Sequence, residues 1–203
     1  MARHLVISSQ VAHGHVGLSA IVPALQALGH EVIALPTVLL SNHPGHAKVA
    51  GQRVDPAVLG QMIDALEANG WLGEINVILS GYLPSIEHVA FVAATVERLL
   101  SANPDCRYIC DPVLGDDPKG LYIEANAAAG IRDLLIPLAD IAMPNRFELA
   151  WLADMAVTTP AEAVIAARAL AARTVIATSI PVAAGALLTI EIDAWHTRSF
   201  AVA

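Results

Sequence analysis

Short runs of consecutive hydrophobic residues alternate along the chain with stretches in which hydrophobic residues recur every three or four positions. The runs predict buried strands and the recurring spacing predicts helices. The predicted strands lie at 4–8, 32–35, 75–79, 107–110, 140–143, 175–177 and 186–190. The predicted helices lie at 18–28 and 125–135, at 161–171, and over segments that begin at 55, 85 and 145. Strands that alternate with helices predict an α/β fold with a mostly parallel sheet covered on both faces.

Polar residues mark the ends of several elements. Asp55 and Pro56 have the residue types of an N-cap and a first helical turn. Residues 9–15 are polar, which predicts a loop after the first strand. Residues 36–53 are rich in His, Ser, Asn and Gly, and they are too many for an ordinary connection. We therefore expect an irregular binding loop or flap at 36–53.

The composition indicates one well-buried core. Hydrophobic residues make up 56% of the 203 residues and charged residues 15%, which fits a single domain over residues 1–203. The net charge is −8 and the basic residues form no cluster, so a nucleic-acid partner is not expected. Cys106 and Cys110 lie four positions apart on one predicted strand, about 13 Å from each other, which is too far for a disulfide.

An uncharged run from Thr174 to Ile190 approaches the length of a membrane-spanning helix. Pro181 and Gly185 interrupt this run, which favours two strands and a turn. We also find no secretory leader at the start of the sequence. We therefore expect a soluble, cytoplasmic protein that spans no membrane.

The most informative chemistry lies where the strand 107–110 ends. Asp111, Asp116 and Asp117 follow that strand, interleaved with Pro and Gly. Open α/β sheets bind ligands at the carboxyl ends of their strands, and acids placed there tolerate phosphates when a cation such as Mg²⁺ bridges them. The pattern indicates a metal–nucleotide site, and an acidic surface loop is the alternative.

Histidines at 13, 15, 43 and 46 raise the alternative of a transition-metal site. Their spacing falls short of zinc patterns, and no cysteines stand at ligand spacing, so this alternative is weak.

Five short motifs together carry a resemblance to a known family. They are Ser41-Asn42-His43, Gly81-Tyr82, Asp-Pro-Val-Leu-Gly-Asp at 111–116, Pro-Asn-Arg-Phe-Glu at 144–148, and Ala177-Thr178-Ser179. In order and spacing the chain resembles pyridoxal kinases of the ribokinase-like superfamily. The resemblance implies a three-layer α/β/α sandwich, usually dimeric. It also implies ATP-dependent phosphorylation of the 5′-hydroxyl of pyridoxal, and commonly of pyridoxine and pyridoxamine.

The resemblance assigns substrate contacts to the first half of the chain. Ser9 matches a serine that contacts polar substituents of the vitamin ring, and Tyr82 matches an aromatic wall for that ring. His43 lies in the expected substrate loop. Many relatives have threonine after Ser-Asn-His, whereas this chain has Pro44-Gly45. A hydroxyl contact is lost there, and backbone groups of Gly45 could replace it.

The resemblance assigns nucleotide contacts to the second half. The matching residues are Asp111, Asp116, Tyr122, Asn145, Glu148, Thr178 and Ser179. Asp111 and Glu148 would hold Mg²⁺ with ATP, and a monovalent cation could assist. Asn145 and Glu148 also have the spacing of a helix capping box, and the two roles can coexist at a helix N-terminus.

The catalytic aspartate of the family lies in a Gly-Thr-Gly-Asp run or a similar one, and this sequence has no such run. We therefore expect that aspartate to lie beyond Ala203, which would leave the kinase domain incomplete at its C-terminus. A pyridoxal kinase is the favoured function, although a form that ends at Ala203 could be inactive. The alternatives are a hydroxymethylpyrimidine-type vitamin kinase and a non-catalytic pyridoxal-binding protein.

Overall fold

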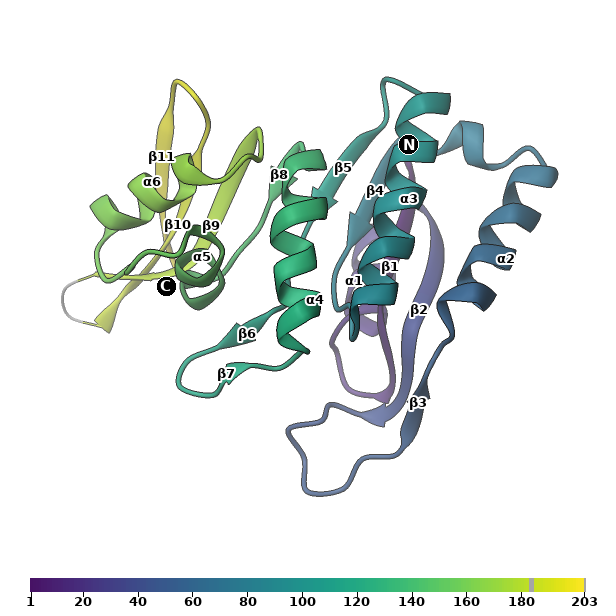
Figure 1. Cartoon of the computed structure of the whole chain (residues 1–203), viewed down its shortest axis with the longest axis horizontal. Coiled ribbons are helices and arrows are strands. Elements are labelled where there is room, and N and C mark those ends of the chain that lie inside the picture. The colour runs from purple at the N-terminus through teal and green to yellow at the C-terminus, as the bar shows by residue number, and fades with distance from the viewer. Residues whose placement is uncertain (183–184, 203) are drawn as a thin grey trace. The chain divides into compact units, whose positions relative to one another are not determined.

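The computed structural model describes residues 1–182 and 185–202, which Figure 1 traces. Contacts between residues divide the chain into two compact units, Met1–Tyr108 and Ile109–Ala203, which we call unit 1 and unit 2. A single domain over residues 1–203 stays a prediction.

Unit 1 is a mostly parallel sheet with helices on both faces. Its elements are, in order, β1 (Arg3–His13), α1 (Leu18–Ala27), β2 (Glu31–Asn42), β3 (Gly51–Arg53), α2 (Pro56–Ala68), a 3-10 helix (Leu72–Glu74), β4 (Val77–Ser80) and α3 (Ile86–Ala102). β1 pairs in parallel with β2 and with β4, and β3 pairs antiparallel with β2. In Figure 1, α2 and α3 lie in front of these strands and α1 behind them. The crossover from β1 to β2 and the one from β2 and β3 back past β1 to β4 run in opposite directions across the sheet, so right-handed connections put α1 and α2 on opposite faces.

The centre of unit 1 is β1. Leu5, Val6 and Ile7 are consecutive and fully buried, which is possible only because both faces of the strand are covered. The predicted start of α2 is confirmed, since the carboxyl of Asp55 accepts a hydrogen bond from the Ala57 N–H at 2.9 Å and Pro56 occupies the first turn.

Unit 2 combines parallel strands with an antiparallel edge. Its elements are β5 (Arg107–Cys110, which begins at the end of unit 1), β6 (Gly115–Asp116), β7 (Gly120–Leu121), α4 (Ala125–Gly130), a π-helical turn (Ile131–Leu135), a 3-10 turn (Ile136–Leu138), β8 (Ile141–Ala142), α5 (Arg146–Ala153), α6 (Pro160–Ala169), β9 (Thr174–Pro181), β10 (Leu187–Ile192) and β11 (Thr197–Val202). β5, β8 and β9 pair in parallel, whereas β10 runs antiparallel to both β9 and β11. The sequence analysis missed β11 and the small β6–β7 hairpin.

The expectation of a polar loop at 9–15 was wrong for residues 9–13 and right for residues 14–15. β1 continues to His13, and Gln10, Val11 and His13 pair with residues of β2. The register shifts between Ser8 and Gln10, so Ser9 lies at an irregularity within the strand. Strand pairing uses backbone groups, and polar side chains therefore do not prevent it.

The expectation of an irregular segment at 36–53 was also wrong for most of its length. β2 runs to Asn42, and β3 returns antiparallel beside Val38, Leu39 and Leu40. We call residues 38–53 the hairpin. Its tip is ordered by polar contacts, among them the Ala50 N–H, which donates to the Ser41 hydroxyl at 3.0 Å.

The uncharged run from Thr174 forms β9 and β10, as predicted. The predicted turn between them includes residues 183–184, which lie outside the described residues. Among the residues described, no helix has the length and apolar character needed to cross a membrane. Cys106 and Cys110 are buried and form no disulfide in the described part of the chain.

Candidate functional site

The acidic strand end predicted from the sequence begins directly after β5. Asp111 follows the last residue of that strand and is partly buried. Burial raises the pKa of the Asp111 carboxyl to about 6, because a carboxylate removed from water loses hydration of its charge. Asp111 is therefore held in an environment that disfavours its negative charge.

A buried capping box opens the neighbouring helix α5, as the sequence predicted. The Asn145 side chain accepts a hydrogen bond from the Glu148 N–H at 2.9 Å, and the Glu148 carboxyl accepts one from the Asn145 N–H at 2.8 Å. The other oxygen of Glu148 accepts a hydrogen bond from the Leu114 N–H at 2.8 Å. Asn145 also donates to the Gly115 carbonyl at 2.9 Å. These contacts fasten the acidic loop to the N-terminus of α5.

Glu148 is a buried carboxyl with a raised pKa. It is 3% exposed. Burial raises its pKa to about 7, with a contribution from the charge of Asp111, although hydrogen bonds from backbone N–H groups act in the opposite direction. Asp111 and Glu148 are thus close enough to repel each other when both are ionised. A bound cation would relieve that repulsion.

Asp116 and Tyr122 belong to the same region. The Tyr122 N–H donates to the Leu114 carbonyl at 2.8 Å. Burial raises the pKa of the Tyr122 hydroxyl, and the charges of Asp116 and Glu148 add to the effect. The phenol therefore lies within reach of both acids.

Gly115 is a residue whose importance the sequence analysis did not state. A Cβ at this position would lie 2.3 Å from the Gly120 carbonyl oxygen and 2.6 Å from the Phe147 ring. Any side chain would push the loop away from α5. The glycine inside the 111–116 motif was the available signal.

Thr178 and Ser179 lie beside the start of α5. The Thr178 N–H donates to the Pro144 carbonyl at 2.9 Å, and Thr178 forms a parallel bridge with Asn145. Ser179 follows with a backbone φ of 59°, which is uncommon for a residue other than glycine. Unit 2 therefore gathers most of the predicted nucleotide residues at one end of its parallel strands. Asp117 forms an ion pair with Arg146.

Unit 1 contains the predicted substrate residues in two groups. Ser9 comes directly after the buried segment of β1, and Tyr82 lies two residues after the end of β4. A Cβ on Gly17 would lie 2.3 Å from both the carbonyl oxygen and the hydroxyl oxygen of Ser9, so Ser9 lies against the start of α1. The Tyr82 N–H donates to the hydroxyl of Ser8 at 3.2 Å. These contacts place both residues around the same segment of β1.

His43 and Gly45 form the second group, at the tip of the hairpin. The Gly45 N–H donates to Nδ1 of His43 at 3.0 Å. The backbone donor that could have replaced the missing threonine hydroxyl is therefore engaged within the tip.

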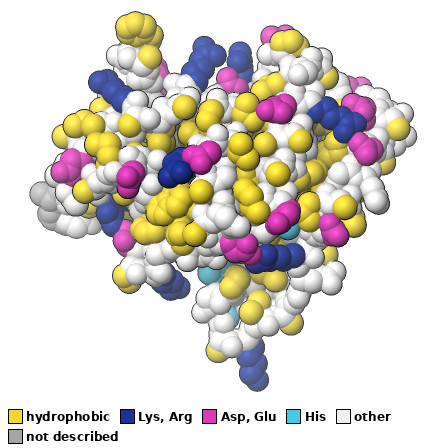
Figure 2. All heavy atoms as spheres, in the orientation of Figure 1, with side chains coloured by type: hydrophobic (Ala, Val, Ile, Leu, Met, Phe, Trp, Pro, Cys, Tyr) yellow, Lys and Arg dark blue, Asp and Glu magenta, His cyan; other side chains and the backbone are white. Residues whose placement is uncertain are grey.

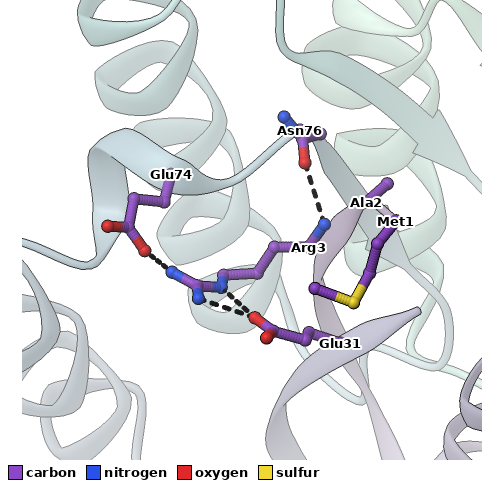
Figure 3. A pocket seen from close by; sticks show the side chains of 6 residues that line it. All are labelled: Met1, Ala2, Arg3, Glu31, Glu74 and Asn76. Atoms are coloured by element: carbon purple, nitrogen blue, oxygen red, sulfur yellow. Dashed lines mark hydrogen bonds and ion pairs between the residues drawn. The ribbon is translucent and has the colours of Figure 1, made fainter. Parts of the chain in front are cut away.

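Unit 1 contains two hollows whose linings do not include Ser9, His43, Gly45 or Tyr82. The first has a volume of about 170 Å³ and is lined by Met1, Ala2, Arg3, Glu31, Glu74 and Asn76. Figure 3 shows Arg3 reaching between the two glutamates. This hollow lies at the amino ends of the strands, whereas α/β sheets bind ligands at the carboxyl ends. The second, of about 290 Å³, lies along β1, β2 and β3 and includes Gln10 and Ser41.

Charged side chains show no gathering of one sign on the face in Figure 2. Lys and Arg side chains are scattered over it, several of them next to Asp or Glu. Across the described residues, no group of three or more His, Cys, Asp and Glu side chains could hold a metal ion by itself. A metal at Asp111 would therefore need oxygen ligands from water or from a bound phosphate.

Comparisons with known proteins identify similar chains. A family model described as phosphomethylpyrimidine kinase matches residues 13–193. Pyridoxal kinase PdxY of Deinococcus radiodurans is 42% identical over 169 residues, which cover 83% of this chain and 57% of that protein. Pyridoxal kinase PdxY of Corynebacterium diphtheriae is 38% identical over 179 residues, covering 87% of this chain and 63% of that protein. This chain thus spans less than two thirds of the length of either relative.

A solved structure gives the same picture of the fold. Pyridoxal kinase from Leishmania donovani in complex with ADP and pyridoxamine is 33% identical and superposes with a TM-score of 0.90, over 99% of this chain and 71% of that one. The predicted α/β fold with a mostly parallel sheet is confirmed, and so is the resemblance to pyridoxal kinases.

Proposed function

Because the chain belongs to the phosphomethylpyrimidine kinase family, we propose that it provides binding groups for the ATP-dependent phosphorylation of the 5′-hydroxyl of pyridoxal. Pyridoxine and pyridoxamine are proposed as further substrates. The observation that carries the proposal is the pair of the buried Glu148 and the partly buried Asp111 beside the N-terminus of α5, with pKa values of about 7 and about 6. Similarity to proteins named pyridoxal kinase selects the substrate.

The residues of unit 2 suit a Mg²⁺–nucleotide. Mg²⁺ would hold phosphate oxygens and offset their charge. Asp111 would contribute to its ligands directly. Both oxygens of Glu148 already accept backbone hydrogen bonds, so Glu148 would act through a water molecule, which Mg²⁺ commonly retains. Asp116, Tyr122, Asn145, Thr178 and Ser179 would contact the nucleotide.

The residues of unit 1 suit a small aromatic alcohol. Ser9 would bond the polar substituents of the ring, and Tyr82 would lie against its flat face. His43 and Gly45 would cover the ring from the hairpin. We assign the base that takes the proton from the hydroxyl to none of the 203 residues.

Three further properties come from the resemblance alone. We propose a homodimer, a place in the cytoplasm, and a monovalent cation that assists nucleotide binding. Size-exclusion chromatography with light scattering tests the first, and a dimeric mass is expected.

Competition between substrates tests the proposed function. The protein is incubated with Mg-ATP and equal amounts of pyridoxal and hydroxymethylpyrimidine, and each phosphorylated product is quantified. Preference for pyridoxal is expected. Preference for the pyrimidine would favour the vitamin-kinase alternative, to which the family description also points. Pyridoxal binding without product would favour the non-catalytic alternative, and no binding would exclude both pyridoxal functions.

A matched pair of aspartates tests the nucleotide side. Asp111→Asn is expected to weaken Mg-ADP binding about tenfold or more, because it removes a charge that faces the metal. Asp133→Asn is the control, since Asp133 is exposed on unit 2 and pairs with its neighbour Arg132. Equal Mg-ADP affinities of the two variants would remove Asp111 from the site.

A further inference from the structure

Unit 1 contains a chain of buried hydrogen bonds that the proposed function does not use. Its side chains are those of Ser8, Thr37, Ser85 and His88, each at most 6% exposed. They come from β1, β2 and the start of α3, and they converge on the base of the hairpin and on Tyr82.

His88 forms the first link. Its Nε2 lies 2.9 Å from the Val54 carbonyl oxygen, and its Nδ1 lies 2.9 Å from the Ser85 hydroxyl. A carbonyl oxygen only accepts, so Nε2 carries a proton and donates it. In the neutral ring Nδ1 then accepts from Ser85. Burial lowers the pKa of the His88 ring, with Val54, Arg53, Glu87 and Asp55 as the other groups that act on it, which favours the neutral ring.

Val54 and Thr37 carry the chain onward. Val54 follows β3 directly, at the base of the hairpin, and its N–H donates to the Thr37 carbonyl at 2.9 Å. The hydroxyl of Thr37, which is fully buried, donates to the Tyr82 carbonyl at 2.7 Å. The Tyr82 N–H in turn donates to Ser8 at 3.2 Å. Tyr82 is thus held by hydrogen bonds at both its N–H and its carbonyl.

The fit around Tyr82 leaves little freedom. The Gly81 N–H donates to the Ile7 carbonyl at 2.9 Å, and a Cβ on Gly81 would lie 2.5 Å from the Ser8 hydroxyl. Hydrogen bonds inside a protein are electrostatically stronger than those in water, and a fully paired network holds a single arrangement.

We propose that His88 and Thr37 are positioning residues, which fix the base of the hairpin and the backbone of Tyr82 and thereby set the affinity for the pyridoxal ring. The proposal rests on the proposed function, in which Tyr82 and the hairpin contact that ring. Neither residue touches the substrate. Their effect passes through Val54 and through the carbonyl of Tyr82.

Two threonines provide a matched pair of variants. Thr37→Val removes the donor to Tyr82. Thr95→Val makes the same chemical change at another buried site of unit 1, where the hydroxyl donates to the Phe91 carbonyl at 2.8 Å within α3. Pyridoxal affinity is measured from the change in its near-ultraviolet absorbance, and Mg-ADP affinity by equilibrium dialysis.

Thr37→Val is expected to weaken pyridoxal binding about three- to tenfold, the effect of one lost buried hydrogen bond. Mg-ADP binding should stay within twofold of the unchanged protein, and Thr95→Val should leave both affinities within twofold. A general loss of structure would weaken both ligands together. That outcome, or equal pyridoxal affinities for the two variants, would overturn the proposal.

Amide hydrogen exchange tests the positioning without any ligand. His88→Leu removes the donor to Val54, whereas the amide of His88→Gln can still reach that carbonyl. Exchange across residues 38–53 and at Tyr82 is expected to rise severalfold in His88→Leu and to return towards the original rate in His88→Gln. Unchanged exchange in His88→Leu, or equal rates in the two variants, would overturn the positioning role. Failure of the unchanged protein to bind pyridoxal would instead reject the proposed function.

Discussion

The two units bury different kinds of polar side chain. Among the described residues, the buried polar side chains of unit 1 are neutral, namely His4, Ser8, Thr37, Ser80, Ser85, His88 and Thr95. Burial lowers the pKa of both histidines, which favours their neutral forms. Unit 2 instead buries the carboxyl of Glu148, with Asp111 partly buried near it. His4 is an exception in another respect, since its Nδ1 has no hydrogen-bond partner within the part of the chain described.

This difference matches the ligands proposed for each unit. A small uncharged alcohol is recognised by hydrogen bonds of fixed direction, which a rigid neutral network supports. A nucleotide brings several negative charges and a cation, and buried acids gain a partner when that cation binds. The neutral network of unit 1 therefore suits a ligand recognised by the direction of its hydrogen bonds. The acids of unit 2 instead suit a ligand that brings a cation.

The largest expected effect compares the two capping boxes of unit 2. Glu148→Ala leaves the Leu114 and Asn145 N–H groups buried without acceptors, which should cost about 2–4 kcal/mol of unfolding free energy. Glu162→Ala removes the corresponding residue of α6, which is only partly buried and accepts from Thr158 and Thr159. Water can replace that acceptor, so a clearly smaller loss is expected. Urea denaturation measures both losses. Equal losses would show that water also reaches the N–H groups beside Glu148. The two units would then no longer differ in the kind of polar group that they bury.

A smaller effect concerns pH. The folded pKa values of Asp111 and Glu148, about 6 and about 7, lie above the ordinary values of 3.8 and 4.5. Between the ordinary and the raised pKa the folded state keeps protons that the unfolded state releases. The stability that these two carboxyls contribute is therefore greatest below pH 4 and falls as pH rises through 6 to 7. Urea denaturation at a series of pH values, in buffer free of divalent cations, measures this fall.

Glu148→Gln provides the control for that measurement, because it cannot ionise and should flatten the fall. His88 acts in the opposite direction, since its pKa is lowered. Its contribution is present above pH 6.5 and is lost as pH falls below that value, so His88→Gln should change only the acid side of the profile. A stability that rises from pH 5 to 7.5 in the unchanged protein would contradict the raised acid pKa values.

Contacts between neighbours in sequence could be predicted, and contacts between distant residues could not. The caps at Asp55 and Asn145 were found because a capping box joins residues two or three positions apart. The Leu114 contact of Glu148 spans 34 residues, as does the Val54 contact of His88. No periodicity carries such information. The extension of β1 to His13 was missed for a related reason, because its partner strand was itself expected to end at Leu35.

For the candidate site, too, the residues could be predicted but their long-range contacts could not. The resemblance supplied its residues, and in unit 2 the structure gathers Asp111, Asp116, Tyr122, Asn145 and Glu148 around one strand end. The sequence could not show that both oxygens of Glu148 are occupied by backbone donors. Nor could it show that the Gly45 N–H is directed to His43. Both facts depend on how loops fold against their surroundings.

The smallest expected effect concerns the charges that unit 1 leaves at its surface. Arg3→Met removes the ion pairs with Glu31 and Glu74 in the hollow of Figure 3. It keeps the apolar part of the side chain and the backbone hydrogen bond from Arg3 to Asn76. Solvent screens such pairs, so a loss of about 0–1 kcal/mol is expected, and it should shrink further in 1 M salt.

Arg98→Met is the matched control, because Arg98 likewise pairs with two acids, Asp64 and Glu67, between α2 and α3 in a somewhat more exposed setting. Similar small losses for both arginines would show that the surface charges of unit 1 contribute little to its unfolding free energy. The neutral network would then be the main polar contribution. A loss above about 2 kcal/mol for Arg3→Met alone would instead assign the hollow a buried charge. Unit 1 would then resemble unit 2, and the neutral network could no longer be taken as the property that distinguishes unit 1.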